Sequence, residues 1–249
     1  ELIVADDIAA LGQARFELAE LCKKAGDTIG AVYYHELVVA DDPQHPRSLE
    51  ALSDLYVERG NWAGAARALR ALGATAAAPD RKAALLYRLG ELTLSRLGDA
   101  AGADAAFLRA ADLDPNHLPT LRRLIDVYWR AGDAPALLEV AQELAAAGKL
   151  VDPATGPATL ARVAVAAAGA GAMNLAAGIV RGFGADGATR FAAVLVELVG
   201  RTGELSLEPA VAAVIELHRR GQGPAPAAIA AATQLLGVPG ATVTRALGV

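Results

Sequence analysis

Hydrophobic positions recur every three to four residues along much of the chain, in stretches interrupted by short polar pairs. This spacing is typical of amphipathic α-helices. Glycine can take the left-handed conformation that ends one helix, and an Asp or Asn side chain can accept hydrogen bonds from the free N–H groups that open the next. The sequence therefore predicts four helix-turn-helix units, around pairs spaced 34, 38 and 34 residues apart: Gly26-Asp27, Gly60-Asn61, Gly98-Asp99 and Gly132-Asp133.

Prolines follow the same period. Pro43, Pro79, Pro115 and Pro153 lie 36, 36 and 38 residues apart, and proline cannot continue a helix. We therefore expect each proline to close the second helix of a unit, which gives helix pairs of about 34 residues. The third unit carries one extra residue before Gly98.

Small residues on both helices of a unit would let the two helices approach closely. Three units have them before and after the turn, at Ala19, Ser53, Gly90, Ala31, Ala65 and Ala103, whereas the fourth has Ile125 and Leu137 in these places. Larger side chains recur with helical spacing, and we expect them to fill the core between the helices. These are Leu18, Tyr56, Leu69, Leu89, Phe107, Leu124 and Tyr128.

Residues 12–148 resemble the tetratricopeptide repeat (TPR) family. The stretches most like the family are Leu89-Gly90 with Ala103, Phe107, Ala110 and Asp114-Pro115, and Tyr56 with Gly60, Trp62 and Ala65. The resemblance implies an all-α fold, a right-handed α-solenoid of helix-turn-helix repeats, whose first helices line a concave groove that receives a partner peptide. A generic helical bundle is the alternative. The large aromatic residue that the family favours early in its first helix is replaced in all four units, by Arg15, Leu49, Leu86 and Leu121.

Three parts are expected along the chain. Residues 1–7 resemble residues 36–42, so residues 1–11 are predicted to hold the end of a preceding repeat, closing at Asp7, and the start of the first helix; the chain would then be a fragment of a longer protein. Residues 12–156 hold the four repeats. Residues 157–249 hold degenerate helical repeats, with helices expected at about 158–170, 172–183, 188–201, 207–220, 225–236 and 240–247.

An uncharged run of 18 residues at 163–180 is long enough to raise the question of a membrane span. The run is mostly Ala and Gly, it carries Asn174, and it has Gly169 and Gly171 where the repeat places its turn. We therefore expect two short, closely packed helices there and no membrane insertion.

Composition narrows the class of protein. With 54% hydrophobic but only 4% aromatic residues, the chain favours helix over an all-β fold. A net charge of -5 and a pI near 5.4 disfavour nucleic acid as a partner. The single cysteine, Cys22, forms no internal disulfide and is expected to be a buried, inert thiol, which fits a cytoplasmic location better than an exported one.

No pattern of catalytic residues stands out. The four histidines have neither HExxH nor Cys/His metal spacing, and no phosphate-binding loop, dinucleotide fingerprint or nucleophile elbow occurs. We therefore expect no enzyme activity, no catalytic residue, no cofactor and no metal. His45 and His117 follow predicted second helices and are interpreted as turn residues.

One set of residues does suggest a binding surface. The residue that directly follows Ala19, Ser53, Gly90 or Ile125 is acidic in all four units. Residues one turn away lie on the same face of the helix as this acidic residue. Like charges at Glu50, Asp54 and Glu58 should repel one another, which favours a partner with a basic segment. The candidate partner-binding residues are Phe16, Glu20, Glu50, Asp54, Glu58, Tyr87, Glu91, Arg122, Asp126, Trp129 and Arg130.

The leading hypothesis is therefore a noncatalytic scaffold that binds a protein or peptide through the concave face of the solenoid. A structural subunit docked through the charge-poor C-terminal third is the second hypothesis, with residues 190–249 contacting a partner or another copy of the chain. An accessory segment of a longer enzyme is the third. The alternative for the candidate residues is that they lie on solvent-exposed helix faces and bind no partner.

Overall fold

A computed structural model of the protein describes residues 2–182. The chain consists of two compact units, residues 1–120 and residues 121–249, and each unit is described by itself. The helices expected at 188–201, 207–220, 225–236 and 240–247, and the contact surface expected at 190–249, lie outside the described residues. Within these residues the chain forms helices and no strand.

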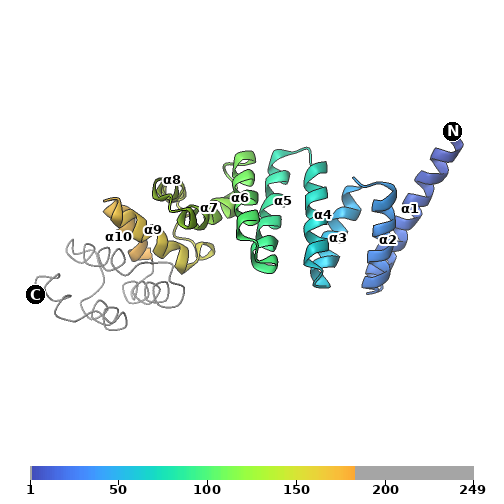
Figure 1. The fold of residues 1–249 in the computed structure, drawn as a ribbon, viewed down its shortest axis with the longest axis horizontal. Coiled ribbons are helices and arrows are strands. Elements are labelled where there is room, and N and C mark those ends of the chain that lie inside the picture. Colours follow the sequence, from blue (N-terminus) through green and yellow to red (C-terminus); the bar gives the residue numbers. More distant parts are fainter. Residues whose placement is uncertain (1, 183–249) are drawn as a thin grey trace, which may run out of the picture. The chain divides into compact units, whose positions relative to one another are not determined.

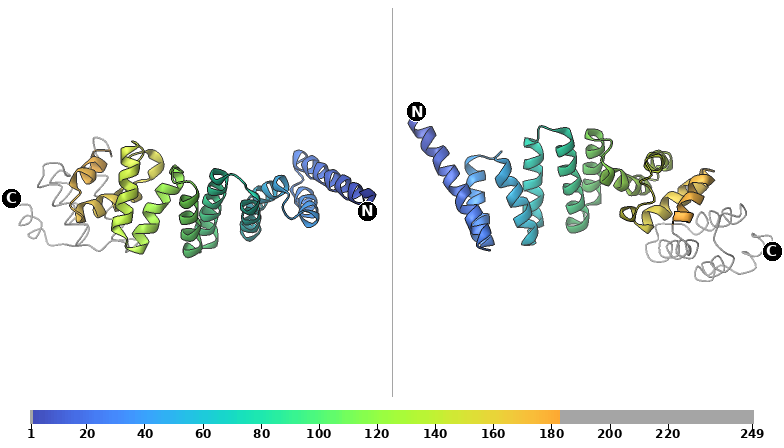
Figure 2. Two further views of the ribbon diagram at one scale, coloured as in Figure 1. Left: turned by 90° about the horizontal axis from the view of Figure 1, so that it is seen from above. Right: turned by 180° about the vertical axis from the view of Figure 1, so that it is seen from behind.

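The first unit contains six α-helices and a short π-helix. They are α1 (Leu2–Lys24), α2 (Thr28–Asp41), α3 (Pro46–Glu58), α4 (Trp62–Thr75), α5 (Pro79–Leu92), the π-helix η1 (Thr93–Leu97) and α6 (Ala100–Leu113). Figures 1 and 2 show these helices following one another in chain order, each packed beside the next. This nearest-neighbour stacking is the packing expected of a helical-repeat protein.

The four predicted turns are confirmed. The backbone φ angles of Gly26, Gly60, Gly98 and Gly132 are 77°, 71°, 68° and 71°, in the left-handed region that ends a helix. The residue that follows each glycine caps the next helix, as in the third unit, where the Gly102 N–H donates to the Asp99 carboxylate over 2.9 Å. Equivalent bonds at the other three turns run from Gly30 to Asp27, from Gly64 to Asn61 and from Ala136 to Asp133.

The proline prediction is confirmed at two positions and wrong at two. Pro43 and Pro115 follow the ends of α2 and α6. Pro79, by contrast, is the first residue of α5, and Pro153 is the first residue of a 3-10 helix. The fixed φ of proline suits the first turn of a helix, where its missing N–H is not needed. The first helix of the third repeat consequently begins at Pro79.

The extra residue of the third unit is taken up by the π-helix η1. This segment continues α5 directly, ends at Leu97 and is followed by the left-handed Gly98. A π-turn accommodates one additional residue without interrupting the helix. The insertion therefore leaves the Gly98-Asp99 turn in place and lets α6 pack as its counterparts do.

Helix α1 differs from the prediction. It runs without a break from Leu2 to Lys24, so the helix end expected at Asp7 does not exist. The similar stretch that ends at Asp42 is followed by Pro43, whereas Asp7 is followed by Ile8. Without a proline or glycine to end the helix at that point, the two aspartates alone do not stop it.

The core of the first unit joins three consecutive helices at a time. One cluster links α2, α3 and α4 through residues that include Val32, Leu52 and Ala68. The next links α3, α4 and α5, and its members are Leu49, Ala65, Ala66, Leu69, Leu72, Leu85, Leu89 and Leu92. Because each cluster is shared between neighbouring repeats, each repeat depends on the next one for burial of its apolar face.

The small packing residues are confirmed as buried. Gly90 is packed closely, because a Cβ built there would lie 2.5 Å from Cε1 of Phe107, which is fully buried. Among the larger residues predicted for the core, Leu69, Leu89, Phe107 and Leu124 are buried, and Tyr56 and Tyr128 are half-buried. Leu18 is 43% exposed, so that prediction is wrong. It lies about 100° around the helix from the buried Ala19.

In the second unit the described elements begin with α7 (Leu118–Ala131), whose first three residues belong to the first unit. The others are α8 (Ala134–Ala146), the 3-10 helix η2 (Pro153–Thr155), α9 (Pro157–Gly169) and α10 (Met173–Gly182). The uncharged run at 163–180 thus forms parts of two short helices, separated by a turn in which Gly171 has a φ of 76°. In the part of the chain described, no helix is both long enough and apolar enough to cross a membrane.

Candidate functional site

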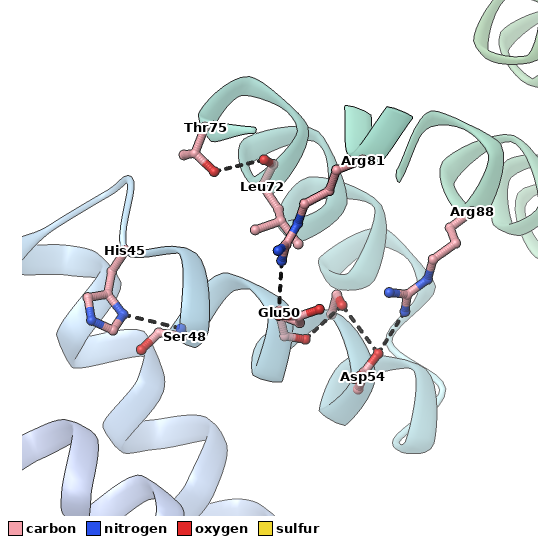
Figure 3. A network of polar contacts seen from close by, with 9 residues as sticks. His45, Ser48, Glu50, Asp54, Leu72, Thr75, Arg81 and Arg88 are labelled. Atoms are coloured by element: carbon pink, nitrogen blue, oxygen red, sulfur yellow. Dashed lines mark hydrogen bonds and ion pairs between the residues drawn. The ribbon is translucent and has the colours of Figure 1, made fainter. Parts of the chain in front are cut away.

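Two ion pairs connect the first helices of consecutive repeats. Asp54 on α3 accepts a hydrogen bond from Arg88 on α5 over 2.7 Å, and Glu50 lies 3.3 Å from Arg81 (Figure 3). All four side chains are exposed, by 43% to 55%. We refer to these four residues, together with Glu58 on the same face of α3, as the first-helix surface.

Because of these ion pairs, the first-helix surface is not the purely acidic one that the sequence predicted for α3. The sequence predicted repulsion among the acidic residues of α3, but the carboxylates of Glu50 and Asp54 each have an arginine beside them. Glu58 is exposed and has no ion-pair partner among residues 2–182. The first-helix surface therefore carries both signs of charge, with one unpaired carboxylate at its end.

Glu20 lies beside a buried histidine. Its Oε1 atom is 3.6 Å from Nε2 of His35, a nitrogen that has no hydrogen-bond partner in the described structure. Nδ1 of His35 lies 3.2 Å from the Ser48 hydroxyl, and the side chain is fully buried. Burial lowers the pKa of His35 below its usual 6.5, although Glu20 acts in the opposite direction. His35 is thus neutral at pH 7.

Phe16 belongs to the core, contrary to its predicted place on a binding surface. It is 5% exposed, and its ring packs against those of His35 and His45, at centroid distances of 5.7 and 5.4 Å. The guanidinium of Arg47 lies 4.4 Å above the ring centroid. Because the ring is covered by α2 and the start of α3, a partner has little of it to contact.

Asp126, in the second unit, is enclosed by its own neighbours. Its carboxylate accepts hydrogen bonds from Arg162 over 2.7 Å and from the Thr159 hydroxyl over 3.0 Å, and only 13% of the side chain is exposed. Arg122 pairs instead with Asp152 and donates to the Thr155 hydroxyl. The Asp126 carboxylate thus acts as a link between α7 and α9.

The remaining candidates have mixed surroundings. Tyr87 is half-buried, with its ring 5.8 Å from that of Phe107 and 5.5 Å from that of His117. Glu91 is also half-buried, and Arg130 is exposed. Trp129 lines an apolar cavity of 720 Å³ formed by α7, α8 and α9.

Sequence reasoning missed the arginines that pair with the acidic positions. Arg88 follows Asp54 by 34 residues and Arg162 follows Asp126 by 36. This separation is about one repeat, so a basic residue one period after Asp54 and after Asp126 was the signal that could have identified these two arginines.

Three other polar side chains, those of Tyr56, His45 and His117, are hydrogen-bonded to neighbouring groups. Burial and a hydrogen bond to Glu36 raise the pKa of Tyr56 to about 12, so this phenol stays protonated. Nδ1 of His45 accepts from the Ser48 N–H at the start of α3, and Nδ1 of His117 lies 2.7 Å from the Thr120 hydroxyl. Cys22 is half-buried and not fully buried as expected. No group of three or more His, Cys, Asp or Glu residues in the described part could hold a metal ion.

Comparison with known proteins identifies the fold. No protein-family model matches the sequence, and no curated protein matches it. Among solved structures, MamA is 19% identical over 79% of this chain and 97% of its own, with a TM-score of 0.50. A Podosopora anserina protein described as a kinesin light chain with nearly identical TPR-like repeats is 19% identical over 76% of this chain and 94% of its own, with a TM-score of 0.44. PilW, a widely conserved type IV pilus biogenesis factor, is 17% identical over 85% and 94%, with a TM-score of 0.43.

The described helices therefore have a TPR-like fold, an all-α series of helix-turn-helix repeats. This confirms the fold class and the family resemblance predicted from the sequence. At this level of identity the likeness to MamA concerns the fold alone.

Proposed function

We propose that this chain is a noncatalytic scaffold that binds another protein across the first-helix surface. The main support is the pair of contacts Asp54–Arg88 and Glu50–Arg81, which present charged side chains of two consecutive repeats on one accessible face. Ion pairs this exposed contribute about 0–1 kcal/mol to stability. A charged group of a partner can therefore replace one member of a pair at little cost to the fold.

The partner is a peptide segment that carries Lys or Arg. Its first basic side chain binds Glu58, the unpaired carboxylate, and a second one competes with Arg88 for Asp54, which lies one helical turn away. Binding of this kind is weakened by salt because all the groups involved are exposed.

A display library of random dodecapeptides, panned on the purified chain, tests this proposal. We expect enrichment of Lys- or Arg-containing peptides whose affinity, measured by fluorescence anisotropy, falls on going from low to physiological salt. The double variant Asp54→Asn/Glu58→Gln should weaken these peptides about tenfold, because two surface charge contacts of about 0.2–1 kcal/mol each are lost.

Glu139 and Glu143 provide the matched control. They are exposed, they stand four residues apart on α8, and Glu139→Gln/Glu143→Gln changes the net charge by the same amount. This control variant should bind the selected peptides as the parent chain does. Equal weakening by both variants, or no enrichment of basic peptides, would contradict the proposal.

A further inference from the structure

A groove lies among α4, α5 and α6. It is on a different face of α5 from the one that carries Arg81 and Arg88. Its volume is 490 Å³. Leu86, which is half-buried, offers apolar surface to the groove, whereas Leu69, Leu85 and Leu89 of its lining are buried. Helices α4 and α6 supply its two sides. Gly73 and Ala74 on α4, with Gly102 and Ala105 on α6, keep both sides low. Walls made of such small residues let another main chain approach closely.

Three basic side chains surround this groove, and no acidic residue lines it. Arg70 comes from α4, Lys82 from α5 and Arg109 from α6. No carboxylate of residues 2–182 lies within ion-pair distance of any of the three. Arg81 and Arg88 on the first-helix surface, by contrast, are paired. The groove is therefore a site of uncompensated positive charge on a chain whose net charge is -5.

We propose that this groove, referred to below as the basic groove, binds an acidic peptide segment of a partner protein that also carries Leu or another large apolar residue. The apolar side chain of the peptide packs on the half-buried Leu86 and on the exposed Ala74 and Ala105. Its Asp or Glu side chains bind Arg70, Lys82 and Arg109. Charge complementarity of this kind sets both the rate and the specificity of association.

The distribution of charge favours a peptide over an anionic lipid. The three cations stand on three different helices around the groove, whereas a single headgroup is best held by cations that converge on it. A chain with several carboxylates along its length can meet all three. The low walls of Gly and Ala suit the same elongated ligand.

The basic groove and the first-helix surface are separate sites with opposite charge preferences. Their residues do not overlap, although both use α5. The chain would therefore hold one basic and one acidic segment, from one partner or from two. Either site can fail a test without affecting the other.

The experiment is a second panning of the dodecapeptide library, on the Asp54→Asn/Glu58→Gln chain so that basic ligands are disfavoured. We expect enrichment of peptides that combine Asp or Glu with a large apolar residue. The triple variant Arg70→Gln/Lys82→Gln/Arg109→Gln should weaken the selected peptides by at least tenfold, since it removes every charge around the groove.

The control variant Lys24→Gln/Arg59→Gln/Lys149→Gln removes three exposed positive charges away from the groove and should leave binding unchanged. Ala105→Glu, an exposed position on the groove wall, should weaken binding by placing a negative charge inside the groove. Circular dichroism of each variant checks that the helices are intact. Cosedimentation of the chain with vesicles of phosphatidylcholine and phosphatidylserine tests whether the groove binds anionic lipid instead.

Loss of peptide binding in the groove variants and not in the control supports the proposal. Three results would overturn it: selected peptides that lack acidic residues, equal loss of binding in the two triple variants, or cosedimentation with anionic vesicles that depends on Arg70, Lys82 and Arg109 while no acidic peptide binds.

Discussion

The close approach of Gly90 to Phe107 makes a quantitative test of how the third repeat is packed. A Cβ at position 90 would lie 2.5, 2.8 and 2.9 Å from three ring atoms of Phe107. Phe107 has no exposed surface, so its ring has no free space into which it can move. Gly90→Ala therefore forces either the ring or the two helices apart, and overpacking of this kind costs about 1–3 kcal/mol.

An opposing term must be separated from this cost. Alanine in a helix interior is more favourable than glycine by about 0.5–1 kcal/mol. Gly73 on α4 provides the reference because it is helical and buried, and an added Cβ there has nothing within 4 Å. We expect Gly73→Ala to raise the free energy of unfolding by roughly the propensity gain and Gly90→Ala to lie about 1–3 kcal/mol below it.

Urea denaturation followed by circular dichroism measures both variants. A double-mutant cycle with Phe107→Leu completes the test, because the smaller side chain leaves room for the methyl group at position 90. In that background, Gly90→Ala should no longer be destabilising relative to Gly90. If Gly90→Ala stabilises the parent chain as much as Gly73→Ala does, the close packing described for α5 and α6 is refuted.

Two further predictions follow from single side chains. Burial holds the pKa of His35 below its usual 6.5, so unfolding is coupled to proton uptake, and the free energy of unfolding should be highest above pH 6.5 and fall as the pH drops below that value. Denaturation curves of His35→Gln measured at several pH values should lack this fall in the free energy of unfolding below pH 6.5. If the free energy of unfolding of His35→Gln falls with pH as steeply as that of the parent chain, the assignment to His35 is wrong. Asp99→Ala removes the carboxylate that accepts from the Gly102 N–H and should lower the free energy of unfolding by about 1 kcal/mol. Asp112→Ala, at an exposed position near the end of α6, is the control and should leave the free energy of unfolding unchanged. Equal effects of the two substitutions would exclude the lost cap as the cause.

The turns and the helical repeat were predictable from the sequence alone. The Gly98-Asp99 turn is an example, because the left-handed glycine, the capping aspartate and the N–H that it accepts from lie within five consecutive residues. Such interactions need no information from distant parts of the chain. The buried Ala31 and Ala65 were predictable for a similar reason, since small residues at fixed distances from a turn mark where two adjacent helices meet.

Proline positions show where a local rule was ambiguous. A proline can follow the end of one helix or open the next, and its own residue type does not distinguish the two. Pro43 follows α2, whereas Pro79 opens α5. Residues 1–7 show a related limit, because the stretch they resemble owes its helix end to the proline that follows it.

The two candidate surfaces depended on tertiary structure. Asp54 meets Arg88 across 34 residues, and the basic groove draws Arg70, Lys82 and Arg109 from three helices. Which charged side chains meet in this way depends on the rise and rotation from one repeat to the next, since a small change in helix orientation moves a long side chain from one neighbour to another. Helical periodicity assigned each residue to a face of its own helix; the packing of that helix against its neighbours decided whether the face was buried, as at Phe16, paired, as at Asp54, or left charged, as at Arg70.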